Sequence, residues 1–350
     1  MAAKRVSISE FLQLRNHHPV LDVRSPGEYA HAHIPGAFAF PLFTDEERKV
    51  VGTAYKQESR EKAIKIGLKY FGSRMVQMVE DAEKLCSEFY HSDHNKTLLV
   101  HCWRGGMRSG AVTWLLTLYG FDIVTLAGGY KAFRHWVAQQ FEKEYNFNVV
   151  GGFTGTGKTN VLSALTEKNE QVLDLEQLAH HRGSAFGSLG MPGQPTQEMF
   201  ENKLALALQQ LNAGDPTWIE DESQRIGNVN TPTVLFKQLR TKPVYFVELS
   251  FENRLENIVR DYGVFDKPLL EDAINRISKR LGGLETKNAI AHLHEGSVKE
   301  CFRILLSYYD KWYLKSLQLR PDWQTLVKTI PVDTADPAAI ATKLIENKNE

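Results

Sequence analysis

A glycine-rich loop between a predicted strand and a predicted helix is the feature that most constrains the fold. The strand covers residues 147–150, the loop reads GGFTGTGKTN from position 151, and the helix covers 160–167. The loop has the Walker A spacing, in which glycines let the backbone approach phosphate oxygens and a lysine neutralises their charge. A plain glycine-rich turn is the alternative. The candidate phosphate-binding residues are Gly152, Gly155, Gly157, Lys158 and Thr159.

A second loop of this kind follows a predicted strand over 97–101 and precedes a helical pattern over 109–118. Backbone N–H groups of such a loop can converge on one centre, and the helix dipole adds about half a positive charge there. A thiol in that position loses its proton more easily. Cys102 is therefore predicted to be a nucleophile in an anion-binding cup, with a buried core cysteine as the alternative. The cup would be formed by Arg104, Gly105, Gly106, Arg108 and Ser109.

The alternation of strands and helices predicts an α/β fold with about two domains. Residues 1–140 are expected to form a parallel-sheet domain, closed by a helix over 133–145. Residues 145–350 are expected to form a second domain that carries the phosphate loop and is helical in its C-terminal part. Near the start, Ser9 is expected to cap a helix over 10–15.

Charge and cysteine content limit the function classes. Lys+Arg and Asp+Glu number 42 each, so binding of a polyanion through global charge is excluded. Three cysteines are too few for a disulfide framework and suit a reducing cytosol. Because the sequence shows no signal-peptide pattern and no apolar run of about 18 residues, we expect a cytoplasmic protein without a membrane segment.

An acidic turn supplies candidate metal ligands for the phosphate loop. A predicted apolar strand over 216–219 leads into Glu220 and Asp221, which is where a Walker B carboxylate stands. One of these acids is expected to hold a metal ion or a water molecule, and the expected metal site is Mg²⁺ held by Thr159 and Asp221. A solvated acidic turn is the alternative.

Two stretches that surround the loops have two interpretations each. The insert 43–72 is either a solvated surface helix or a wall that contacts RNA through Arg48, Lys56, Arg60 and Lys65. The segment 180–187 is either a flexible lid or a source of side chains for the phosphate site, namely His180, His181 and Arg182.

The helical pattern beyond residue 251 is also open to two interpretations. Its basic residues are expected to lie on a solvated face, with RNA contact as the alternative: Arg254, Arg260, Arg276, Lys279 and Arg280. Its aromatic residues are expected to pack as helix core rather than to stack on bases: Phe302, Tyr308, Tyr309, Trp312 and Tyr313.

Three segments of the first domain resemble rhodanese domains in order and content. They are LDVRSPGEYAHAHIPGA, the loop HCWRGGMRSG and the segment LAGGYKAFRHW. The resemblance implies that Cys102 carries a transferred chalcogen as a persulfide or perselenide. Five residues separate Cys102 from Arg108, one more than in many sulfur-transferring relatives, and this spacing also matches rhodanese-like cysteine phosphatases. The wider cup suits a tetrahedral anion and suggests a phosphate-bearing donor.

The whole arrangement, with EDES and HRGSAFG in the second domain, resembles the tRNA 2-selenouridine synthase family. That resemblance implies conversion of 2-thiouridine at the tRNA wobble position (U34) to 2-selenouridine through an S-geranyl intermediate. The implied substrates are tRNA, geranyl diphosphate and selenophosphate, with selenophosphate synthetase as a source of the donor and no tightly bound cofactor. Cys102 would carry selenium as a perselenide. Lys158 and Thr159 would bind the diphosphate, although ATP or GTP would also fit the motif.

The sequence leaves two alternative functions open. One is an enzyme of a different kind, a rhodanese-type sulfurtransferase or a cysteine phosphatase fused to a nucleotide-binding domain. The other is a regulatory module without catalysis, against which the intact cysteine and the intact Walker A pattern both count.

Overall fold

The computed structural model describes residues 3–91 and 96–348, and the chain divides into two compact units, Met1–Gln139 and Gln140–Glu350. Both units are built on parallel sheets with helices between the strands, which confirms the predicted α/β class. In the described part of the chain, no helix is both long enough and apolar enough to span a membrane.

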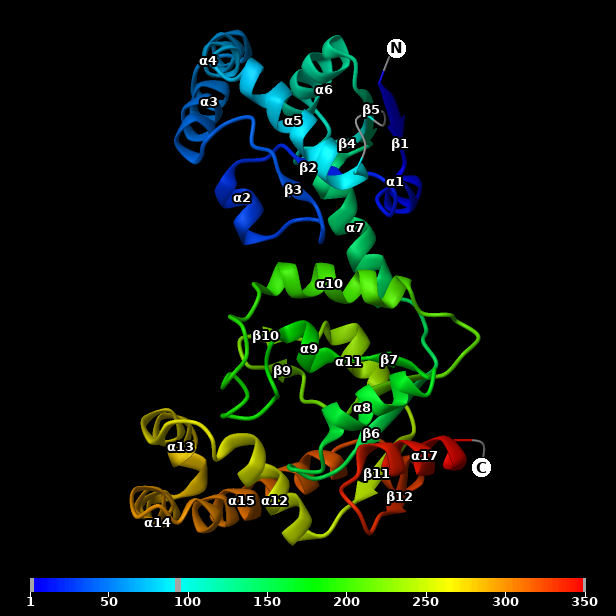
Figure 1. Ribbon diagram of the computed structural model, residues 1–350, viewed down its shortest axis with the longest axis vertical. Helices are drawn as coiled ribbons and strands as arrows, with labels where there is room; N and C mark the ends of the chain where they lie inside the picture. The colour runs from blue at the N-terminus through cyan, green and yellow to red at the C-terminus, as the bar shows by residue number, and fades with distance from the viewer. Residues whose placement is uncertain (1–2, 92–95, 349–350) are drawn as a thin grey trace. The chain divides into compact units, whose positions relative to one another are not determined.

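The first unit contains a five-stranded parallel sheet in the order β1-β5-β4-β2-β3 (Figure 1). Strand β4 is central and buried, so its carboxyl end is held on both sides by neighbours. The elements are β1 (Lys4–Val6), α1 (Ile8–Leu14), β2 (Val20–Asp22), α2 (Pro26–His31), β3 (Phe38–Ala39), α3 (Asp45–Gln57), α4 (Arg60–Gly72), α5 (Met75–Tyr90), β4 (Thr97–His101), α6 (Met107–Tyr119), β5 (Asp122–Leu126) and α7 (Gly129–Phe141).

Local sequence explains most of these boundaries. Both helices of the insert begin at a hydroxyl cap, since Thr44 accepts from the N–H of Glu47 and Ser59 from that of Lys62. The prediction for α1 was wrong at its start, because Ser7 and not Ser9 is the capping residue. Helix α7 begins four residues earlier than predicted, at Gly129, and ends at Phe141.

A buried ion pair lies under the carboxyl end of the central strands. Asp22 of β2 is in register with His101 of β4. The Arg24 guanidinium donates to both Asp22 oxygens, with Nη2 2.6 Å from Oδ2, and lies 3.8 Å from the centre of the Tyr130 ring. Burial raises the pKa of Asp22, while His101 and Arg24 lower it, and the net change is a decrease.

Replacing Arg24 with alanine would leave the Asp22 carboxylate buried without its cation. We expect Arg24→Ala to lower the free energy of unfolding by about 3–5 kcal/mol, measured by urea denaturation. Lys4→Ala, which breaks the exposed pair with Glu10, is the control and should cost less than about 1 kcal/mol. Because the native pKa of Asp22 is depressed, the pair's contribution should be full above about pH 4 and disappear as the pH falls. Equal stability of both variants would contradict the role of the pair.

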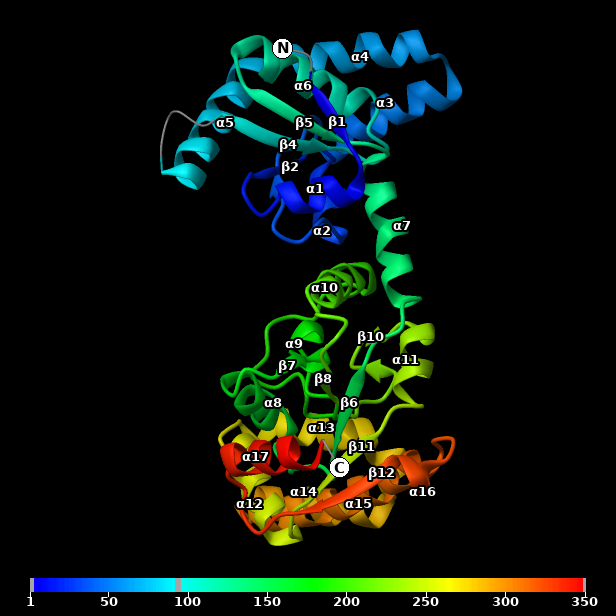
Figure 2. The same ribbon diagram turned by 90° about the vertical axis from the view of Figure 1, so that its right-hand side faces the viewer.

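The second unit contains a five-stranded parallel sheet in the order β12-β11-β6-β8-β7 and a small antiparallel pair, β9 and β10. Helices α8 and α17 lie side by side over one face of this sheet (Figures 1 and 2). The elements are β6 (Phe147–Gly151), α8 (Lys158–Glu167), β7 (Gln171–Leu173), α9 (Leu175–Ala179), α10 (Gln197–Gln209), β8 (Thr217–Glu220), β9 (Arg225–Ile226), β10 (Val229–Asn230), α11 (Thr233–Leu239), β11 (Val244–Glu248), α12 (Phe251–Tyr262), α13 (Lys267–Leu281), α14 (Gly283–His294), α15 (Val298–Gln318), α16 (Trp323–Leu326), β12 (Val327–Pro331) and α17 (Pro337–Asn347).

The predicted helical C-terminal part is present, together with one strand that the sequence did not indicate. Strand β12 pairs in parallel with β11, from Val327 opposite Val244 to Pro331 opposite Glu248. It lies at the sheet edge and buries only Ile330, so its sequence carries too weak a pattern to indicate a strand. The helices α12 to α15 do form together, around a core cluster of their own (Figure 1).

The sequence pattern also predicted the wrong environment for one basic residue of this region. Arg254 of α12 is 3% exposed and donates to both oxygens of Asp310 at 2.8 Å. It therefore belongs to the interior of the second unit and not to a solvated face.

Candidate functional site

The thiol of Cys102 lies at the end of β4, where the chain turns into α6. The Gly106 N–H points at Sγ with a separation of 3.4 Å, and the Ser109 hydroxyl lies 3.2 Å from the same sulfur. The backbone N–H groups of Arg104 and Ser109 add to this environment. The sulfur is thus surrounded by donors, as the sequence predicted for a cup, and the residue is only 3% exposed.

These donors decide the acidity of the thiol. Burial by itself raises the pKa of Cys102, but hydrogen bonds from Ser109, Gly106 and Arg104 outweigh it, so the pKa lies below the ordinary value. Burial dominates at the two other cysteines. Burial raises the pKa of Cys86 to about 11 and that of Cys301 to about 12.

The cup is closed by the start of α7. The N–H groups of Tyr130 and Lys131 donate to the carbonyls of Cys102 and Trp103. Gly129 has a φ of +60°, and a side-chain carbon there would lie 2.4 Å from the Cys102 carbonyl oxygen. Only glycine fits at this close approach, which explains why Ala-Gly-Gly-Tyr follows β5.

The predicted cup residues differ in their roles. Arg104 is exposed, while Gly105, with a φ of +64°, makes the turn. Arg108 points to Glu28 of α2, with Nη1 2.5 Å from Oε2. Burial raises the pKa of Glu28, but the hydrogen bond and charge of Arg108 lower it to about 2. The sequence alone does not single out Glu28 as a partner of the cup, because Arg108 lies 80 residues away from it.

Arg48, one of the predicted RNA-contacting residues of the insert, also lies near this pair. Its Nε is 3.5 Å from Glu28 Oε2, and its side chain is half exposed. Helix α3 of the insert therefore contributes a cation close to the cup, as a wall would.

Alkylation by iodoacetamide tests the acidity of the Cys102 thiol. We expect Cys102 to react at neutral pH much faster than Cys86, because the thiolate is the reactive form and only Cys102 has a lowered pKa. Ser109→Ala removes the hydroxyl that lies 3.2 Å from Sγ and should move the midpoint of the rate–pH profile to higher pH. Mass spectrometry of the cysteine peptides gives both rates. Equal alkylation of Cys102 and Cys86 at pH 7 would contradict the prediction.

The phosphate loop lies between β6 and α8 in the second unit. Three of its glycines have positive φ, +152° at Gly152, +84° at Gly155 and +80° at Gly157. The Lys158 ammonium donates to the Gly152 carbonyl at 3.0 Å and so reaches back across the loop. From outside the loop, Arg254 donates to the Thr154 carbonyl and Asn257 to the Gly155 carbonyl.

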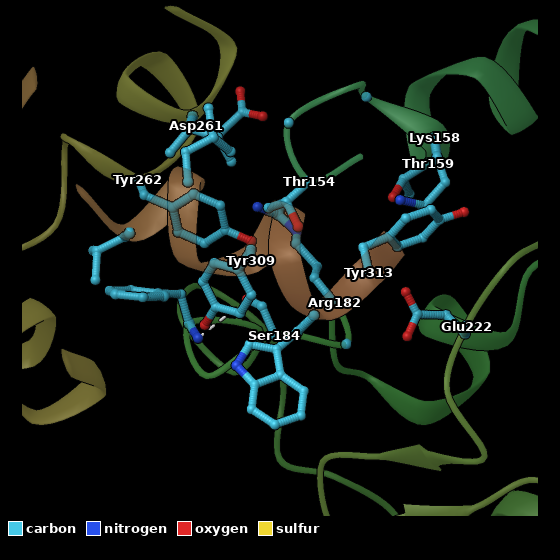
Figure 3. Close-up of a pocket in the computed structure, with 18 of the residues that line it drawn as sticks. Thr154, Lys158, Thr159, Arg182, Ser184, Glu222, Asp261, Tyr262, Tyr309 and Tyr313 are labelled. Carbon is cyan, nitrogen blue, oxygen red and sulfur yellow. Dashed lines mark hydrogen bonds between the residues drawn. The ribbon is translucent and has the colours of Figure 1, made fainter. Parts of the chain in front are cut away.

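A cavity of about 550 Å³ opens from this loop. Figure 3 shows Lys158 and Thr159 at one end of it and Tyr262 toward the other, with α15 behind. Asp221, Glu222 and Arg182 also line it. The loop, the acidic turn and the segment after α9 thus meet at one site, as the sequence suggested.

The residues of the predicted metal site have protein partners in the structure. Thr159 Oγ1 donates to Glu176 Oε2 at 2.8 Å. Both oxygens of Asp221 accept from protein donors, one from Tyr313 and the other from Arg320. Thr159 and Asp221 are thus each paired with other residues, and a Mg²⁺ ion held by the two stays a prediction.

Glu220 and Glu222 have a different character from Asp221. Glu220 is buried, and its Oε1 accepts from the Glu176 N–H at 2.8 Å. Burial, together with repulsion from Asp174 and Glu176, raises the pKa of Glu220 well above its ordinary value. Burial beside Glu176 does the same for the pKa of Glu222. A carboxyl group that can hold a proton therefore lines the cavity, and sequence reasoning had not selected Glu222.

The aromatic residues of α15 pack on the core, as predicted, and they also border the cavity. Phe302 belongs to the core cluster, Tyr308 and Tyr309 pack against it, and these three line the cavity together with Trp312 and Tyr313. The Tyr313 hydroxyl accepts from the Gly152 N–H at 3.1 Å and donates to Asp221 at 2.8 Å. Their helical spacing cannot distinguish a core from a cavity wall.

One of the three residues predicted in the segment 180–187 lies at the cavity of the phosphate loop. Arg182 lines the cavity and lies over the Tyr262 ring. His180 instead ends α9 in a left-handed conformation and contacts the Gly193 carbonyl, while His181 is buried.

The chain has two matching family models and close curated relatives. The models are the Rhodanese-like domain over residues 7–135 and the tRNA 2-selenouridine synthase AAA domain over 145–268. A tRNA 2-selenouridine synthase from Pseudomonas syringae pv. syringae (strain B728a) is 34% identical over 331 residues, covering 84% of this chain and 87% of its own length. Proteins of the same name from Nitrosomonas europaea and Sulfurovum sp. are 33% and 35% identical, covering 86% and 85% of this chain and 90% and 88% of their own lengths.

Among solved structures, an N-terminal domain from Clostridium difficile 630 is 34% identical and covers 38% of this chain and 98% of its own, with a TM-score of 0.35. That score is too low to carry an argument about the fold. The family models and the relatives that match along both units are decisive, and the chain belongs to the tRNA 2-selenouridine synthase family.

Proposed function

We propose that this chain converts 2-thiouridine at the wobble position of tRNA to 2-selenouridine in two chemical steps, one at each loop. The observation that supports the proposal is that each unit has its own candidate site, a thiol near hydrogen-bond donors after β4 and a Walker A loop after β6. The relatives' name supplies the overall reaction.

The first step is alkylation of the thiouridine at the phosphate loop. The 2-thio sulfur attacks C1 of geranyl diphosphate, so a C–S bond forms and the C–O bond breaks. The bonding electron pair leaves with the diphosphate, and the N3 proton of the base is released. Lys158 and the N–H groups of the loop would stabilise the charge of the departing diphosphate. Alkylation turns the sulfur into a better leaving group for the next step.

The second step is selenium transfer at the cup. The Cys102 thiolate attacks selenium of selenophosphate, supplied by selenophosphate synthetase. An S–Se bond forms, and the Se–P bond breaks with its electron pair on phosphorus, which leaves as phosphite. The perselenide then displaces geranylthiolate from C2, so that an Se atom joins Cys102 to the base. One external thiol cleaves the S–Se bond and becomes disulfide-bonded to Cys102, and a second external thiol reduces that disulfide and restores the Cys102 thiol. Release of phosphate without a selenium adduct on Cys102 would contradict this carrier role.

Lys158→Ala tests the assignment of the alkylation step. We expect kcat/KM for geranyl transfer to fall about 10- to 100-fold, since a charge-assisted contact to the diphosphate is lost. Lys168→Ala, at an exposed position just after the same helix, is the control and should leave the rate unchanged. S-geranyl-2-thiouridine in digested tRNA is measured by mass spectrometry. Undiminished geranylation in Lys158→Ala would refute the assignment.

Cys102→Ala tests the separation of the two steps. We expect loss of 2-selenouridine with S-geranyl-2-thiouridine still formed, because alkylation needs no chalcogen carrier. Cys86→Ala, which changes another buried cysteine of the same unit, should retain both products. Loss of both steps in a folded Cys102→Ala protein would count against separate sites.

A further inference from the structure

The cavity that begins at the phosphate loop continues along an apolar wall. Phe186 follows α9, Ile258 belongs to α12, and three more wall residues come from α15: Phe302, Leu305 and Leu306. All five are members of one buried core cluster. The wall of the cavity is therefore a face of the hydrophobic core, and it offers no hydrogen-bonding group.

The tyrosines of the cavity use their hydroxyls on the protein itself. The Tyr313 hydroxyl is bound to Gly152 and Asp221, and the Tyr309 hydroxyl accepts from the Ala185 N–H at 3.2 Å. Tyr262 has its hydroxyl near Arg182 and Ser184, which act as hydrogen-bond partners. In Figure 3 the rings of these tyrosines line the space between the phosphate loop and the far end of the cavity. A ligand there meets ring faces and not free hydroxyls.

Charged groups at the far end are also engaged. The Arg182 guanidinium lies 5.8 Å from the centre of the Tyr262 ring. The Asp261 carboxylate accepts from Arg260 at 3.2 Å and points away from the Tyr262 ring in Figure 3. The apolar wall itself offers a sugar or a nucleobase no hydrogen-bond partner, whereas a hydrocarbon needs none.

Helix α15 runs along the cavity from the phosphate end to the apolar end. Phe302, Leu306, Tyr309 and Tyr313 are spaced by four, three and four residues, so they lie on one face. At 1.5 Å of rise per residue, Phe302 and Tyr313 are about 16 Å apart along the helix axis. Tyr313 marks the phosphate end, because Lys158 Nζ lies 5.6 Å from its ring centre.

We propose that the apolar end of this cavity holds the hydrocarbon chain of a prenyl diphosphate and that Leu306, with Phe302 behind it, limits the chain length. This inference rests on the proposed function of the phosphate loop. The aromatic faces between the two ends also suit the chemistry, because the transferred carbon becomes electron-poor as the diphosphate departs, and ring faces attract positive charge.

Binding to the unmodified protein is the first test. Affinities for inorganic pyrophosphate, dimethylallyl diphosphate and geranyl diphosphate are measured by calorimetry. We expect each added isoprene unit to tighten binding by at least about 10-fold, because apolar surface is buried. Equal affinities for all three ligands would overturn the inference.

Substitution at Leu306 is the second test, with alkylation of tRNA by dimethylallyl, geranyl and farnesyl diphosphates as the readout. Leu306→Phe should lower the kcat/KM ratio of geranyl to dimethylallyl about 10-fold, and Leu306→Ala should raise the ratio of farnesyl to geranyl by a similar factor. Inhibition by inorganic pyrophosphate should be unchanged. Leu314→Ala, which alters a half-exposed leucine of the same helix outside the cavity, is the matched control.

The outcomes separate this inference from the function on which it rests. If wild-type alkylation depends on Lys158 but folded Leu306 variants keep the wild-type ratios, the chain-length assignment is wrong and the proposed function stands. If no prenyl diphosphate alkylates tRNA and ATP binding is weakened by the Leu306 variants, both fail and the cavity is a nucleotide site.

Discussion

Both loops of this protein depend on how the fold uses backbone carbonyl groups. At the cup, the carbonyls of Cys102 and Trp103 accept from the start of α7. At the phosphate loop, the carbonyls of Thr154 and Gly155 accept from side chains of α12. These hydrogen bonds satisfy the loop carbonyls and hold the backbone of each loop in its turn conformation. The loop carbonyls of the cup thus accept from main-chain N–H groups, whereas those of the phosphate loop accept from side chains.

Sequence reasoning found what is encoded over short distances. The spacing of Gly157, Lys158 and Thr159 and the position of Cys102 after a strand each follow from a local pattern, and the structure has the predicted strand, loop and helix at both places. The family and the α/β class followed from the same segments. Each of these features can be predicted from residues that are close to one another in the sequence.

Contacts between distant segments were not predictable in this way. Asp221 stands where a metal ligand is expected, but Arg320 and Tyr313 reach it from about 90 to 100 residues away. The sequence pattern around Arg254 is typical of a surface residue, and only the tertiary structure brings Asp310 next to it. The aromatic spacing of α15 is the same for a helix that packs fully and for one that borders a cavity. In each case the deciding partner is supplied by tertiary structure.

Helix α15 contacts both the phosphate loop and the cavity beside it. Through the Tyr313 hydroxyl it fixes Gly152 and Asp221, and through its other residues it borders the hollow beside them. The helix cannot slide or tilt without disturbing the glycine turn at Gly152. A change in the size of a side chain on its cavity face is therefore the kind of change that reshapes the hollow and leaves that turn in place.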